Sequence, residues 1–147
     1  MYADTSVFGG CFDSEFQAES RQFFDEVRQG RFMIVVSDIT SRELAQAPEE
    51  VRRTLAGLPV EQVEFVESSE ESESLQEAYL RAEVVGRASS NDAGHIALAT
   101  VADVDIVVSW NFRHIVHFEK IAGYESVNAL RGYRSPRIYS PREVIEP

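Results

Sequence analysis

Short apolar runs separated by helix-like stretches are the feature of this chain that most restricts its fold. The run Phe32 to Val36 has the length of a strand, and segment 105–109, Asp-Ile-Val-Val-Ser, has the composition of a buried strand. Apolar residues recur with helical spacing in 14–29, where Gly30 is the expected stop. Strands that alternate with helices need crossover connections, which are right-handed and give parallel pairing. The sequence therefore predicts an α/β fold with a mostly parallel central sheet covered by helices on both faces.

Helix-end residues and the remaining apolar segments complete the expected order of elements. Pro48 suits the first turn of a short helix that ends near Gly57, and Ser140 and Pro141 mark the start of a final turn. The length fits a single domain that covers residues 1–147 and has room for a core. We expect strands at 1–8, 32–36, 62–66, 105–109 and 137–139, and helices at 14–29, from 37–40 onward, at 48–57, 70–85 and 90–103, and between Trp110 and Gly132.

Composition places the chain among ordinary globular proteins. Hydrophobic residues make up 44% of the sequence and aromatic residues 10%, which is too apolar for a disordered chain. Cys11 is the single cysteine, so no internal disulfide forms, which favours a reducing compartment. No apolar run approaches the ~20 residues of a membrane span. We therefore expect a soluble, cytoplasmic protein without a membrane partner.

The net charge of −11 argues against sequence-independent binding of nucleic acid through a broad basic surface. The charge is unevenly distributed, however, because residues 111–147 hold six basic and four acidic side chains. A surface that contacts phosphates is therefore expected near the C-terminal end. By contrast, the stretch from Glu61 to Glu77 has seven glutamates and no basic residue, which fits a solvated face or a docking patch for a basic partner.

Four polar residues fall where an α/β sheet gathers distant segments into one cleft, namely Asp4, Glu43, Asp92 and Asn111. Aspartate is depleted in strands and a buried charge needs a partner, so Asp4 points to a functional role. Asp92 also suits the first turn of a helix without any ligand, Glu43 suits an exposed helix face, and Asn111 suits a turn. Three acids and an amide together would form a site for a hard cation such as Mg²⁺, which suggests phosphodiester chemistry.

Four motifs in this chain resemble those of the PIN-domain nucleases, a family that includes the VapC-type toxins of bacterial toxin–antitoxin pairs. The motifs are Asp4-Thr5-Ser6, Ser41-Arg42-Glu43-Leu44, Asn91-Asp92-Ala93-Gly94-His95-Ile96-Ala97-Leu98-Ala99 and Ser109-Trp110-Asn111-Phe112-Arg113-His114-Ile115. Their order and spacing extend the similarity over nearly the whole chain. The resemblance implies a three-layer α/β/α fold and an endoribonuclease that depends on Mg²⁺ or Mn²⁺. It assigns Asp4, Glu43 and Asp92 as catalytic acids and metal ligands.

Residues around these acids are expected to hold solvent or substrate. Asn111 stands where the family usually has a fourth acid, and it is expected to be a catalytic residue whose amide oxygen ligates a metal or orients its water. Because one negative charge is missing, a weakened activity is expected and the number of metals stays open. Basic groups that follow this position can meet phosphates near the metal. The residues expected to contact substrate are Thr5, Ser6, Ser109, Arg113 and His114.

Two ring side chains inside the motifs have simpler interpretations. His95 lies one turn after Asp92 on the same helical face, and a packed, hydrogen-bonded histidine is favoured over a ligand because Mg²⁺ prefers oxygen. Trp110 is expected to bridge the core and the cleft, in preference to stacking on a base.

The expected function is therefore that of an endoribonuclease, the toxin of a toxin–antitoxin pair, with RNA as its substrate. Its expected partner is a small antitoxin whose basic tail enters the acidic cleft, and a homodimer is also compatible with the sequence. Two other functions stay open: a catalytically impaired PIN-like module that binds RNA or protein, and another metal-dependent phosphohydrolase. A Rossmann dehydrogenase is disfavoured because no Gly-x-Gly-x-x-Gly motif follows the first strand.

Overall fold

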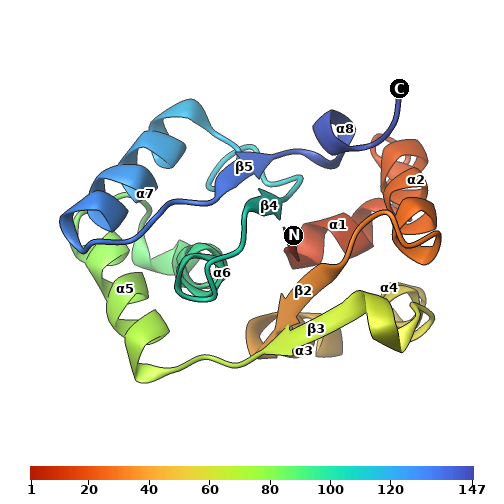
Figure 1. Ribbon diagram of the computed structural model, residues 1–147, viewed down its shortest axis with the longest axis horizontal. Coiled ribbons are helices and arrows are strands. Elements are labelled where there is room, and N and C mark those ends of the chain that lie inside the picture. Colours follow the sequence, from red (N-terminus) through yellow and green to blue (C-terminus); the bar gives the residue numbers. More distant parts are fainter.

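The computed structural model describes all 147 residues of the chain. Five parallel strands form one sheet in the order β3-β2-β1-β4-β5, with helices on both faces (Figure 1), which confirms the predicted three-layer α/β fold class. None of the helices combines the length and the apolar character that crossing a membrane requires.

The strands are β1 (Tyr2–Ala3), β2 (Ile34–Ser37), β3 (Val63–Val66), β4 (Ile106–Val108) and β5 (Arg137–Tyr139). The helices are α1 (Thr5–Gly10), α2 (Gln17–Arg28), α3 (Asp38–Ala45), α4 (Glu49–Ala56), α5 (Glu70–Arg81), α6 (Ser90–Val101), α7 (Phe118–Leu130) and α8 (Pro141–Val144).

Alternation of side chains along the strands gives the sheet two apolar faces. Tyr2 is paired with Val35 on one side and with Val107 on the other, and Val107 is paired with Ile138. These four buried side chains form one row, and they pack with residues of α5, α6 and α7 in the larger of two cores. The next position along β1, Ala3, belongs to the second core, which α1, α2, α3 and α4 complete. Figure 1 shows these helix groups on opposite sides of the strands.

Helix ends follow local signals in the sequence. Gly30 has a φ of 82° just beyond α2, as the predicted stop requires, and Ser140 forms a capping box at the start of α8. The helix expected at 70–85 is shorter than predicted and ends at Arg81. Glu83 has a φ of 58°, so the chain leaves the helical conformation before the predicted end.

The first strand is much shorter than the predicted span 1–8, which is the main correction to the sequence analysis. Pairing of β1 with β4 ends at Ala3, opposite Val108. Asp4 is the N-cap of α1, and Thr5 begins that helix, whereas the sequence had placed both in a strand. Aspartate is a favoured N-cap residue, so this position suits the start of a helix better than the interior of a strand.

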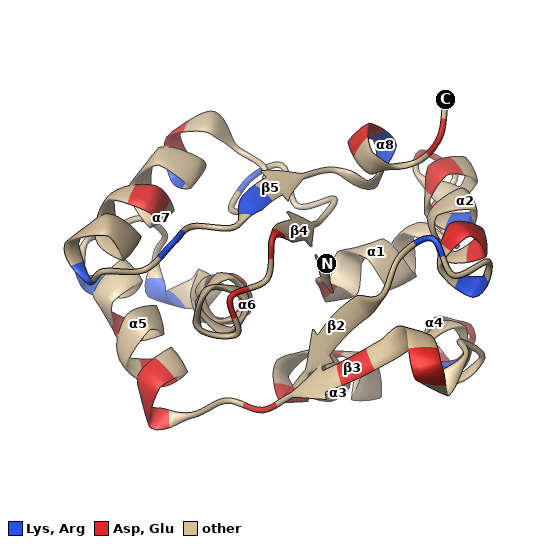
Figure 2. Cartoon of the chain, in the orientation of Figure 1, with Lys and Arg blue, Asp and Glu red and all other residues tan.

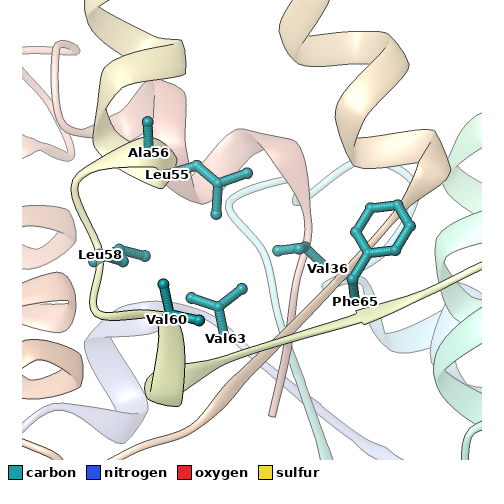
Figure 3. A pocket seen from close by; sticks show the side chains of 7 residues that line it. All are labelled: Val36, Leu55, Ala56, Leu58, Val60, Val63 and Phe65. Carbon is teal, nitrogen blue, oxygen red and sulfur yellow. The ribbon is translucent and has the colours of Figure 1, made fainter.

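An apolar pocket opens between the end of α4 and the edge strand β3 (Figure 3). Val60 is 86% exposed and Phe65 is 51% exposed, so much apolar surface faces solvent here. β3 also has a free edge, because β2 is its only neighbour in the sheet. Apolar surface beside a free strand edge is typical of a contact surface for another chain. The pocket is lined by Val36, Leu55, Ala56, Leu58, Val60, Val63 and Phe65.

Two neighbouring glycines of α1 offer a matched test of packing around this helix. A Cβ atom at Gly10 would collide with the Ser20 hydroxyl and would lie 2.7 Å from Trp110 Nε1. A Cβ atom at Gly9 would meet nothing within 4 Å. Gly10→Ala should therefore lower the free energy of unfolding by about 1 to 3 kcal/mol, and Gly9→Ala should raise it by up to about 1 kcal/mol. Urea unfolding of both variants measures the difference, and equal effects would contradict the close contact.

Candidate functional site

The structure places the predicted acids around the carboxyl end of the sheet. Asp4 directly follows β1, and Ser109 directly follows the neighbouring strand β4. The strand order changes direction between β1 and β4, and in parallel α/β sheets ligand clefts form at such a switch point. Glu43 lies on α3 and Asp92 in the first turn of α6. Burial raises the pKa of Asp4 and the charge of Asp92 adds to that rise, so these two carboxylates interact.

Two serine hydroxyls hold Asp4, one on each carboxylate oxygen. Ser6 Oγ donates to Asp4 Oδ1 at 2.6 Å, and Ser109 Oγ donates to Asp4 Oδ2 at 2.8 Å. Each hydroxyl also accepts a backbone N–H, from Trp110 for Ser6 at 2.8 Å and from Asn111 for Ser109 at 2.9 Å. The loop after β4 therefore fixes the orientation of a carboxylate that follows β1.

Asp4 is a buried carboxylate without a cationic side chain beside it. The residue is only 4% exposed, and no Lys or Arg forms an ion pair with it. Burial raises the pKa of its carboxyl above the ordinary value, and His95 and the two hydroxyl donors oppose that rise. A buried negative charge in this position would be stabilised by a cation supplied from outside the chain.

A hydrogen-bonded chain of buried groups holds Glu43. Thr5 Oγ1 donates to Glu43 Oε1 at 2.8 Å, and His95 Nε2 lies 2.6 Å from the same oxygen. Burial would raise the pKa of Glu43, but the hydrogen bonds from His95 and Thr5 outweigh it and the pKa is lowered. On the other side of the ring, His95 Nδ1 lies 2.6 Å from the Tyr2 hydroxyl, which lies 2.8 Å from Ser37 Oγ. Because an ionised Glu43 only accepts, Nε2 of His95 carries the hydrogen of this bond.

Asn111 lies beside Asp92 but directs its amide oxygen into its own loop. The oxygen accepts the backbone N–H groups of Arg113 at 3.2 Å and of His114 at 2.9 Å, and the side chain lies close enough to Asp92 to lower the pKa of that carboxyl. Burial raises the pKa of Asp92, while His95 and His114 oppose that rise. Both lone pairs of the Asn111 oxygen are therefore occupied, and the residue acts as a turn residue, the alternative that the sequence had left open.

The residues expected to hold substrate fall into two groups. Thr5, Ser6 and Ser109 each bond a carboxylate, so they position the acids. Arg113 is exposed, and His114 Nδ1 is buried without a hydrogen-bond partner. Arg113 is therefore accessible to a ligand, whereas Nδ1 of His114 and the three hydroxyl groups are not.

The sequence analysis missed Tyr2 and Ser37, which complete the support of Glu43. The only signal for them was the expectation that a buried His95 needs hydrogen-bond partners, and the structure confirms a packed, hydrogen-bonded histidine that is 1% exposed. Trp110 is 5% exposed and its ring nitrogen donates to Ser20 Oγ at 2.7 Å, which confirms its packing role.

The donor chemistry of the site fits a hard divalent cation, although its geometry is not that of an assembled metal centre. No three Asp, Glu, His or Cys side chains converge to hold a metal ion. Asp4, Glu43 and Asp92 nevertheless offer oxygen donors, and none of them is paired with Lys or Arg. A divalent cation would relieve the burial penalty that raises the pKa values of Asp4 and Asp92.

The fold is similar to that of a chain in the crystal structure of VapBC2 from Rickettsia felis bound to a DNA fragment from their promoter. The two structures align with a TM-score of 0.56 and 11% sequence identity, over 95% of this chain and 96% of that chain. At this identity the similarity establishes the fold alone. No protein-family model matches the sequence, and no curated protein matches it.

Removal of a single hydroxyl tests the hydrogen-bonded chain that ends at Glu43. In Tyr2→Phe, Nδ1 of His95 loses its partner while Glu43 still accepts from Nε2, so the Nδ1 signal should shift in ¹⁵N NMR spectra of the imidazole rings. Tyr79→Phe is the matched control, because Tyr79 is equally buried and its hydroxyl contacts Thr100. Each variant should lose about 1 to 2 kcal/mol of unfolding free energy, but only Tyr2→Phe should change the His95 signals.

Proposed function

We propose that this chain is a metal-dependent endoribonuclease of the PIN type. The observation that carries the proposal is the placement of Asp4, Glu43 and Asp92 at the carboxyl edge of the sheet, with no Lys or Arg paired to them. The fold similarity to a chain of the VapBC2 structure and the four PIN-like motifs support it.

In the proposed enzyme, Asp4, Glu43 and Asp92 would hold Mg²⁺ or Mn²⁺. When bound, the cation would supply Lewis-acid chemistry, which lowers the pKa of water for attack on a backbone phosphate. The protein contributes fixed carboxylates: Ser6 and Ser109 keep both oxygens of Asp4 in place, and the chain through His95 keeps Glu43 in place. Such outer hydrogen bonds orient metal ligands and tune their affinity.

Basic side chains around the acids contact the phosphates of the substrate in this proposal. Arg113 is exposed on the loop after β4 and is the first such group. On the other side, Arg42 lines an open polar pocket beside Glu43 with Asn91. Charge-assisted hydrogen bonds from such groups would position the strand without reading its sequence.

The acidic surface around α3, β3 and the starts of α4 and α5 fits a small protein partner with a basic tail. In this proposal the partner is the antitoxin and this chain is the toxin of a toxin–antitoxin pair. Acidic residues gather at the starts of α4 and α5, and they outnumber basic ones on α3 and β3 (Figure 2). The apolar pocket between α4 and β3 offers an anchor for such a chain (Figure 3). An Arg or Lys from the tail would pair with the free carboxylates and exclude the metal.

Cleavage assays test the nuclease directly. Purified protein should cut RNA with Mn²⁺ or Mg²⁺ and should be inactive in EDTA. Asp92→Asn should lower the rate at least about 100-fold, more than the loss of a metal's outer hydrogen bonds usually causes. Glu119→Gln, at an exposed acid of α7, should leave the rate unchanged.

A substrate panel separates the remaining candidates. Cleavage of DNA or of a small phosphate ester in place of RNA would assign the site to another phosphohydrolase. RNA binding without turnover would favour a catalytically impaired module, which the occupied oxygen of Asn111 supports as the second candidate.

Metal binding should be visible as thermal stabilisation. At a cation concentration of about 100 times Kd, Mg²⁺ or Mn²⁺ should raise Tm by about 5 to 10 °C and should have little effect on Asp4→Asn/Asp92→Asn. Asn111→Asp keeps an acceptor for the loop N–H groups but places a second negative charge near Asp92. Its Tm should therefore fall in EDTA and rise more with metal than that of the natural protein. Equal shifts in all three proteins would contradict the assigned ligands.

A further inference from the structure

An aromatic cluster adjoins the acidic site on the loop that follows β4. Trp110 is stacked on Phe16, with ring centroids 4.3 Å apart and planes at 17°. Phe112 packs at the edge of both rings, 6.1 Å from Trp110 and 6.2 Å from Phe16. Trp110 is only 5% exposed, whereas Phe112 is 46% exposed. The stacked pair of buried Trp110 and half-buried Phe16 therefore forms a support, and Phe112 presents a large apolar surface to solvent.

The loop holds Phe112 rigidly. Its N–H donates to the Trp110 carbonyl at 3.0 Å, and the Trp110 N–H is bonded to Ser6. On the other side, the Asn111 side chain accepts the N–H groups of Arg113 and His114. An exposed ring on an ordered backbone loses little entropy when a ligand covers it, because the conformation is already fixed.

The position of Phe112 relates it to the acids. It comes three residues after Ser109, which bonds Asp4, so its Cα lies within about 11 Å of the Ser109 Cα. Arg113 and Arg142 are exposed nearby, and the Arg142 guanidinium lies 5.6 Å from the Trp110 ring. An exposed aromatic ring beside basic groups is the combination that binds an unpaired nucleotide.

We propose that Phe112 is a stacking site for an unpaired nucleobase next to the phosphate that is cleaved. This inference rests on the proposed ribonuclease function and narrows its substrate to single-stranded RNA. A net charge of −11 limits the affinity that phosphate contacts can supply. Stacking does not depend on charge and accepts every base, so it supplies affinity where electrostatics cannot.

The single tryptophan makes the site observable without cleavage. Trp110 is the only Trp in the chain and lies next to Phe112. A base that covers Phe112 should therefore change the fluorescence of Trp110. The probes are a single-stranded oligoribonucleotide and an abasic oligomer of equal length and charge, mixed with protein and Mn²⁺ by stopped flow before cleavage. The base-containing strand should change the fluorescence and the abasic strand should not.

Variants assign the response to the ring. Phe112→Ala should weaken binding of the base-containing strand about 5- to 150-fold, the range that loss of one stacked base corresponds to. Phe112→Tyr should retain binding, because the aromatic face is kept. Phe118→Ala is the matched control, because Phe118 is a Phe of α7 that is 86% exposed. This variant should bind the RNA strand as tightly as the natural protein does.

The outcomes separate this inference from the proposed function. If RNA binding depends on Phe112 but no cleavage occurs, the stacking site is supported and the proposed nuclease activity is contradicted. Cleavage with equal affinity for the abasic strand, or a Phe112→Ala variant that binds RNA normally, would overturn the stacking site alone. Loss of a protein partner in Phe112→Ala with unchanged RNA binding would likewise overturn it and assign the ring to a protein interface.

Discussion

The buried carboxylate of Asp4 is the constraint on which the rest of the site depends. β1 lies between β2 and β4 in the sheet, so the residue after Ala3 emerges in the middle of the carboxyl edge. No Lys or Arg compensates this charge, and hydroxyl groups of Ser6 and Ser109 take the place of a cation. Because those hydroxyls also accept backbone N–H groups, the acid orders the loop after β4 as much as the loop orders the acid.

Tyr2 joins the packing of the core to the geometry of the site. Its ring belongs to the row of sheet side chains that includes Val35 and Val107, and its hydroxyl contacts His95. A slip of one residue in the pairing of β1 would turn Tyr2 to the other face of the sheet and leave His95 without its partner. The apolar register of the sheet therefore also sets the orientation of Glu43, although that residue lies on a helix.

The fold could be predicted from the sequence where the signals are local. Strand 137–139 and the caps of the helices depend on neighbouring residues, and the parallel topology alone gathers the acids at one edge. The hydrogen-bond partners could not be predicted. Tyr2 and His95, like Asp4 and Ser109, are far apart in sequence, and their contacts depend on side-chain packing that spacing does not encode. The same packing explains why three predicted substrate contacts support acids.

The acidity of the chain is compatible with one narrow contact to nucleic acid. In the proposed nuclease, unpaired carboxylates at the cleft repel phosphates until a divalent cation neutralises them, so metal binding becomes a condition for substrate binding. Acidic side chains on β3 and at the starts of α4 and α5 repel RNA from the remaining surface and attract a basic protein partner (Figure 2). Little affinity can then come from a broad electrostatic surface. The affinity for RNA must come from the few groups beside the metal that carry positive charge or an exposed ring. The loop after Ser109 presents a positive charge in Arg113 and an exposed ring in Phe112.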